Sequence, residues 1–295
     1  MRLTHEEILN NIFSDPCMES YKFDFYFFGG KIVQEISNEN IQRSQHDCLQ
    51  PWYEHSDTDI AFVIPQGTYL VTQIMIKDIV SVLKKYFLSI NMKTSVLVEE
   101  SSEYENLLHI PEYIDKYSIY FMNKFTIVDK WDLIFLNGTA NNDHTVMKTF
   151  ISAFDIDICQ IAKYVGAVQK IDDDDIECAF LEYVKCIKML FPKVKYNIPN
   201  DVLLKIKNFA IKSKTYFRYP CRYIFGSKWN PLAIHKFTPV KFVKFVDGNM
   251  PLNEYEDVVT KRVDKYKKRG FQFDEYSIDC YKNECKRLTT KNNKK

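Results

Sequence analysis

Residues 23–30 read FDFYFFGG, an apolar and aromatic run that ends in two adjacent glycines. The chain has only 8 glycines among its 295 residues, so an adjacent pair is informative. Aromatic residues in a short run favour a β-strand, and the sequence KIVQEI that follows at 31–36 favours a helix. We therefore expect a strand, a glycine turn and a helix start, where backbone N–H groups can approach a phosphate.

Two further apolar segments begin with acidic residues, SDTDIAFV at 56–63 and KWDLIFL at 130–136. Asp57 and Asp59 stand at positions i and i+2 of an expected strand, so their carboxylates share one face. A carboxylate pair of this kind is suited to hold two divalent cations, which stabilise the attacking and leaving oxygens of an in-line phosphoryl displacement. Asp132 opens another apolar strand and would add a third carboxylate.

The segment FDIDICQIAKYV at 154–165 contains a second D-x-D pair, Asp155 and Asp157. It is compatible with a short strand or a helix. Asp157 is therefore a rival for the place of the third acid. We prefer Asp132, because its strand is longer and more clearly apolar.

The order of the expected elements indicates a mixed α/β domain. A strand near 93–100 and two strands that break near Asn123 follow an amphipathic helix at 68–90, in which apolar residues recur at helical spacing. Beyond residue 170 the pattern becomes helical. The helices expected outside the α/β core span 4–13, 172–191, 199–217 and 254–271. The expected units are an α/β domain at 1–168, a smaller basic helical domain at 169–288 and a disordered tail at 289–295.

The net charge of +1 is distributed unevenly along the chain. Residues 1–150 carry 12 Lys and Arg against 21 Asp and Glu, a net charge of −9, whereas residues 151–295 carry +10. An excess of Lys and Arg is expected where phosphates of nucleotides or nucleic acids bind. Lys265 and its neighbours on the helix at 254–271 are the best single candidates for contacts with a triphosphate or an RNA backbone.

The order of FYFFGG, SDTDIAFV and KWDLIFL resembles the nucleotidyltransferase superfamily, which includes DNA polymerase β, poly(A) polymerases and cGAS-like enzymes. The resemblance implies that Gly29 and Gly30, with Lys31 beside them, contact the triphosphate. It also implies that Asp57 and Asp59 bind two Mg²⁺ or Mn²⁺ ions, and that Asp132 binds the metal on the side of the attacking hydroxyl.

Segments such as WDLIFLNG and KRVDKYKKRGFQF also look like blocks in uncharacterised nucleotidyltransferase-like proteins of large eukaryotic DNA viruses. Residues 31–56 form a longer connection than the family pattern has. Two arrangements stay open: this connection is a loop over the site, or the glycine pair packs away from the acids.

The sequence thus predicts transfer of a nucleotidyl group from a nucleoside triphosphate, ATP included, to a hydroxyl acceptor. The alternative is an inactive protein of the same fold that binds a nucleotide or RNA. No run of 18 uncharged apolar residues occurs, so no membrane partner is expected. The start of the chain lacks the apolar region of a secretory signal. Together these features predict a cytoplasmic protein, the host cytoplasm for a viral one.

Overall fold

The computed structural model describes Leu9 and ten longer stretches of the chain. The expected helices at 172–191 and 199–217, and the one at 4–13 apart from Leu9, lie outside the described residues. The described stretches are 23–44, 57–64, 69–90, 95–100, 113–123, 126–138, 143–165, 223–235, 237–244 and 252–292.

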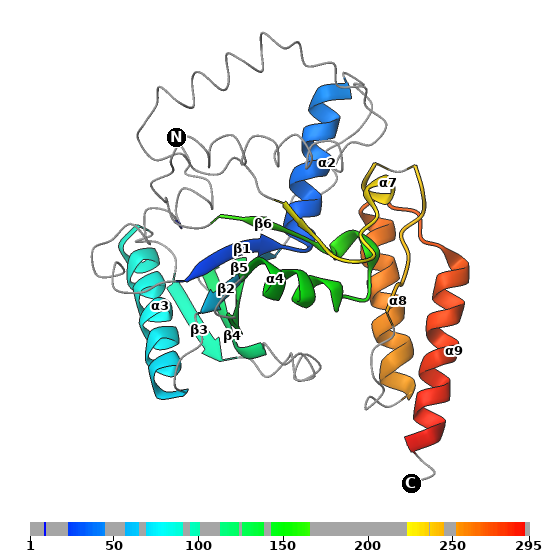
Figure 1. Ribbon diagram of the computed structural model, residues 1–295. Helices are drawn as coiled ribbons and strands as arrows, with labels where there is room; N and C mark the ends of the chain where they lie inside the picture. The colour runs from blue at the N-terminus through cyan, green and yellow to red at the C-terminus, as the bar shows by residue number, and fades with distance from the viewer. Residues whose placement is uncertain are drawn as a thin grey trace.

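A seven-stranded mixed sheet forms the centre of the molecule, with helices around it (Figure 1). The parallel pair is β2 with β5, and every other neighbouring pair is antiparallel. This confirms the expected mixed α/β fold. From one edge to the other the strands are β3 (Ser95–Glu100), β4 (Tyr113–Asn123), β5 (Thr126–Asn137), β2 (Thr58–Ile64), β1 (Asp24–Phe28), β6 (Ile161–Tyr164) and β7 (Tyr223–Phe225).

Alternation along the central strands sends apolar side chains to both faces of the sheet. On one face, the Phe62 and Phe135 rings stack with centroids 5.1 Å apart. That cluster also takes in buried residues of α2 (Gly30–Ser44) and α3 (Tyr69–Ile90). On the other face, Ala61 and Ile134 pack with α4 (Asp143–Ser152). Both faces of the central strands are therefore covered, which explains their nearly continuous apolar sequences.

The C-terminal part of the described chain contains two long helices, α8 (Leu252–Lys268) and α9 (Glu275–Asn292), which stand side by side at one end of the sheet (Figure 1). Gly270, with φ 77°, lies just after α8, where a left-handed residue commonly ends a helix. We did not predict α9 from the sequence, although Ile278, Tyr281 and Cys285 are buried at helical spacing. The helix reaches Asn292 and so includes the first residues of the segment at 289–295 expected to be a disordered tail.

Strand β7 joins the sheet from a distant part of the sequence. Its residues Tyr223–Phe225 pair with β6, so the sheet crosses the domain boundary expected near residue 168. The fully buried side chain of Gln160 fixes this junction. Its Nε2 donates to the carbonyl oxygen of Phe154 at 2.8 Å, and its Oε1 accepts from the backbone N–H of Lys228 at 2.8 Å. Gln160 therefore links the end of α4 to the turn after β7.

Candidate functional site

Parallel pairing of β2 with β5 brings the predicted acids together. Asp59 lies directly opposite Asp132, one pair after Thr58 and Trp131. Both side chains belong to the sheet face that carries Ala61 and Ile134, the face covered further along by α4. Asp57 precedes Asp59 by two residues and shares that face by alternation. These residues, Asp57, Asp59 and Asp132, are called the three site acids below.

The glycine turn packs directly against these acids. Gly29 has a φ of 63°, a left-handed conformation that glycine adopts without strain. A Cβ atom added to Gly29 would lie 3.6 Å from Oδ2 of Asp59. Of the two arrangements left open for residues 31–56, the one in which the glycine pair packs away from the acids is therefore wrong.

The first turn of α2 supplies the remaining atoms expected to meet a phosphate. The N–H of Gly29 donates to the carbonyl oxygen of Ile161 at 3.0 Å and is already used. Gly30 and Lys31 begin the helix, and the first N–H groups of a helix have no acceptor within it. The positive end of the helix dipole adds to the attraction for an anion. Gly29 therefore shapes the turn, and Gly30 and Lys31 stand at the positive end of α2.

The pKa of Asp59 is influenced by burial and by four charged side chains. Burial, together with the neighbouring charges of Asp132 and Asp57, raises the pKa of its carboxyl group to about 7. Lys265 and Lys116 oppose these effects and favour the ionised form. The influence of Lys265 on Asp59 shows that α8 brings this predicted phosphate-binding lysine to the same site.

Asp132 has positive partners that sequence reasoning missed. Its Oδ1 accepts a hydrogen bond of 2.6 Å from the Ser118 hydroxyl. Its Oδ2 lies 3.3 Å from Nζ of Lys116 and 3.2 Å from Nζ of Lys130. Lys116 has no exposed side-chain surface. One feature of the sequence could have indicated this pairing: Lys116 lies on the inward face of an alternating strand. A buried ammonium group there needs a carboxylate partner.

The site acids fit a divalent cation unequally. Asp57 and Asp59 offer carboxylate oxygens, the ligands that Mg²⁺ and Mn²⁺ prefer. Both oxygens of Asp132 already have ammonium or hydroxyl partners. Within the described ranges, no group of three or more His, Cys, Asp or Glu side chains is arranged to hold a metal ion. The residues therefore fit a cation at Asp57 and Asp59, and do not fit the expected third ligand at Asp132.

The rival acid Asp157 has a different environment. It lies in the 3₁₀ helix η3 (Asp157–Cys159) and is buried. Its carboxylate accepts hydrogen bonds from the backbone N–H groups of Ile158 at 2.8 Å and Lys241 at 3.1 Å. The side-chain amide of Asn230 donates a third bond, also at 3.1 Å. Asp157 therefore ties η3 to the segments at 230 and 241.

Helix α8 is anchored beside η3 by two side-chain contacts. The guanidinium of Arg262 pairs with the carboxylate of Asp155. The Tyr266 hydroxyl lies 2.7 Å from Sγ of Cys159. Lys265, between these two anchors in sequence, is exposed. The two contacts therefore hold α8, the helix that carries Lys265, against the segment at 155–159.

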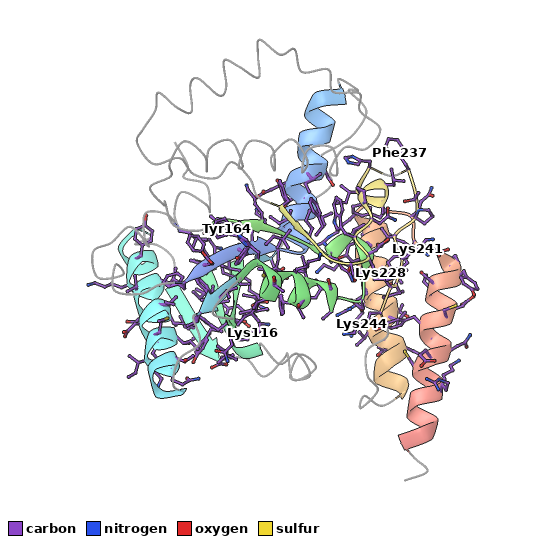
Figure 2. All side chains as sticks on the ribbon, in the orientation of Figure 1. Lys116, Tyr164, Lys228, Phe237, Lys241 and Lys244 are labelled. Atoms are coloured by element: carbon purple, nitrogen blue, oxygen red, sulfur yellow. The ribbon has the colours of Figure 1, made fainter. Side chains whose placement is uncertain are left out.

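The interleaved lysines and aromatic residues at 214–245 lie partly outside the described residues. Within the described part, the Trp229 ring packs on Phe225 with centroids 4.7 Å apart. Figure 2 shows Lys228, Lys241 and Lys244 gathered beside α8 and well separated from Lys116. Trp229 thus packs against Phe225, whereas Phe237 is exposed. Lys228 and Lys241 are exposed and Lys244 is half-buried; these three lysines are called the basic surface below.

Comparisons with known proteins leave the family open. No protein-family model and no curated protein matches the chain. Among solved structures it is similar to one described as a tRNA-processing enzyme in apo form I. That match has a TM-score of 0.28 and 10% sequence identity, and covers 90% of this chain and 67% of the other. A likeness this weak identifies neither the fold nor the function. Within the described residues, no helix has both the length and the apolar character needed to cross a membrane.

Proposed function

We propose that the chain binds a nucleoside triphosphate beside the glycine turn and transfers its nucleotidyl group to a hydroxyl acceptor. The observation that carries this proposal is the packing of Gly29 against Asp59, 3.6 Å from the added Cβ to Oδ2, with Asp132 opposite on the parallel strand. A phosphate-binding turn and clustered carboxylates on one sheet face are the parts that phosphoryl displacement requires.

Each part of the site has a role in this reaction. The first turn of α2, Lys31 and Lys265 would bind the triphosphate through positive charge. Asp57 and Asp59 would hold Mg²⁺ or Mn²⁺, which when bound neutralises phosphate charge. Asp132 keeps the local charge pattern fixed through Lys116 and Lys130. Catalysis would come mainly from positioning and electrostatic stabilisation.

A second candidate is binding of a nucleotide or RNA without transfer. The engagement of both Asp132 oxygens favours it, because the third acid is then withheld from the acceptor hydroxyl. In either case, RNA would bind along the basic surface at Lys228, Lys241 and Lys244, continuing onto α8.

The test is a turnover assay with radiolabelled nucleoside triphosphates, Mg²⁺ or Mn²⁺, and single- or double-stranded RNA. Asp59→Asn is expected to lower the rate about a thousandfold, because it removes charge at the centre of the site. Asp157→Asn is the matched control: it removes another buried carboxylate from a D-x-D pair, and we expect the rate to stay within about twofold of the wild type, because Asp157 lies outside the site.

The outcomes separate the two functions. Product from the wild type that is lost only in Asp59→Asn supports transfer. No product, together with a higher melting temperature in the presence of a triphosphate, supports binding alone. No product and no change in melting temperature contradicts both.

A further inference from the structure

The third site acid is enclosed by positive charge that the nucleotidyltransferase pattern does not include. Lys116 and Lys130 place their ammonium groups 3.3 and 3.2 Å from the same oxygen of Asp132. Ser118 donates to the other oxygen at 2.6 Å. No carboxylate oxygen of Asp132 is left without a donor or a positive partner.

This arrangement is built into the register of β4 and β5. Ser118 lies opposite Asp132, and Tyr120 lies opposite Lys130. Lys116 is two residues before Ser118 and therefore projects from the same face. The ammonium of Lys130 also lies over the Tyr120 ring, 5.6 Å from its centroid. Pairing of the two strands thus fixes both lysines at Asp132.

The burial of Lys116 shows that its pairing with Asp132 is a requirement of the fold. Its side chain has no exposed surface, and that of Lys130 is 22% exposed. A buried ammonium group is tolerated only beside a compensating carboxylate. Lys116 therefore stays beside Asp132 and does not turn away into solvent.

Positive charge stands at Asp132 before any cation arrives. The ammonium groups of Lys116 and Lys130, at 3.3 and 3.2 Å, already outnumber its single negative charge. A divalent cation at Asp132 would have to displace or repel both groups at close range.

Resting on the proposed nucleotidyl transfer, we infer that Lys116 and Lys130 take the place of a divalent cation at Asp132. Asp132 then ligates no metal, and any divalent cation is held by Asp57 and Asp59. Lys116 is a positioning residue that acts through Asp132. Part of the positive charge of the site is therefore permanent and independent of the metal concentration.

The test counts Mn²⁺ ions bound per chain, from the electron paramagnetic resonance signal of free Mn²⁺ during titration of the full chain. The decisive variant is Lys116→Met/Asp132→Asn, which removes the Asp132 carboxylate together with the buried ammonium that needs it and leaves the net charge unchanged. We expect it to bind as many Mn²⁺ ions as the wild type. Loss of one ion per chain would overturn the inference.

A second variant examines the lysines themselves. Lys116→Met/Lys130→Gln leaves Asp132 without ammonium partners, and we expect it to gain one Mn²⁺ ion per chain. Lys228→Gln/Lys241→Gln is the matched control, because it removes two lysines at the basic surface away from the site (Figure 2). If this variant folds and gains no Mn²⁺ ion, the inference that the two lysines take the place of a cation is overturned. If that variant does not fold, the charge-neutral variant decides.

These results are independent of the turnover assay. A wild type that binds no Mn²⁺ leaves the inference standing, because Asp132 then holds no metal, while metal-dependent transfer fails. A wild type that transfers nucleotides but loses one ion in the charge-neutral variant keeps the proposed function and refutes the inference.

Discussion

The chain contains two D-x-D pairs with opposite surroundings. Asp59 lies opposite Asp132 in the parallel pairing, and the charges of Asp132 and Asp57 both raise its pKa. Asp155 and Asp157 flank Ile156, and their carboxylates are taken up by Arg262, by a side-chain amide and by backbone N–H groups. The first pair is held at a glycine turn, whereas the second joins segments of the fold.

The pKa values of Asp157 and Asp59 reflect this difference. Burial raises the pKa of Asp157 against its hydrogen bonds from Lys241, Asn230 and Ile158, and the result is about 6. Burial and the charges of Asp132 and Asp57 together raise the pKa of Asp59, and the result is about 7. A D-x-D pair is therefore a candidate cation site where its neighbours are also acidic, and a structural connector where they are donors.

The largest expected effect on stability comes from Lys116, one of the two lysines that pair with Asp132 beside the first D-x-D pair. Lys116→Met should lower the free energy of unfolding by about 3 kcal/mol, because it removes a fully buried ammonium from a paired carboxylate. Urea denaturation measures the loss. Lys130→Met is the control, with an expected loss of about 1 kcal/mol, since its side chain is partly exposed. Equal losses in the two variants would show that burial of Lys116 is not what matters.

A pH titration addresses the second pair. Because the pKa of Asp157 in the folded chain, about 6, exceeds the ordinary value of 3.8, the folded state binds this proton more tightly than the unfolded state. The contribution to stability is complete below pH 3.8 and is lost as the pH rises through 6. The loss is about 3 kcal/mol, at about 1.4 kcal/mol per pKa unit.

Asp157→Asn should remove this dependence. The difference in unfolding free energy between wild type and variant should therefore shrink from pH 4 to pH 7 by about 2 kcal/mol, most of the full loss. Asp59 titrates in the same direction and is present in both proteins, so the difference isolates Asp157. A difference that grows with pH would mean that the three hydrogen bonds outweigh burial.

The smallest effects compare the glycines beside the two pairs. A Cβ on Gly226 would lie 2.7 Å from Cβ of the buried Gln160, so Gly226→Ala should cost about 2 kcal/mol of stability. Gly29→Ala meets only an ordinary contact with Asp59 but has a positive φ, so it should cost about 1 kcal/mol. Thermal melts measure both variants. If Gly29→Ala lowers the melting temperature more than Gly226→Ala does, the expected order is wrong and the packing is tighter at Gly29 than at Gly226.

Strongly patterned segments could be predicted from the sequence alone. The strand at FDFYFF, the helix at 69–90 and the two strands separated near Asn123 are all present. So is the glycine turn, which follows from local pattern. The position of Asp132 on the strand beside Asp59 was implied by the resemblance in the order of the three motifs.

The parts that escaped sequence reasoning depend on tertiary contacts. Lys116 could not be assigned to Asp132 without the register of β4 against β5. Strand β7 has three residues and is defined by its partner β6. The role of Asp157 as a connector depends on donors at 230 and 241, far from it in the sequence.

The β6–β7 pairing also bears on how this protein can be altered. Tyr223 of β7 lies opposite Lys163 of β6, although residues 166–222 intervene in the sequence. Lys163 and Tyr223 lie on neighbouring strands, which are roughly 5 Å apart. The entropy of holding two points of a chain together changes only slowly with the number of residues between them. The number of residues between β6 and β7 can therefore be increased, for example by inserting a reporter domain, while the strands that carry the site acids keep their register.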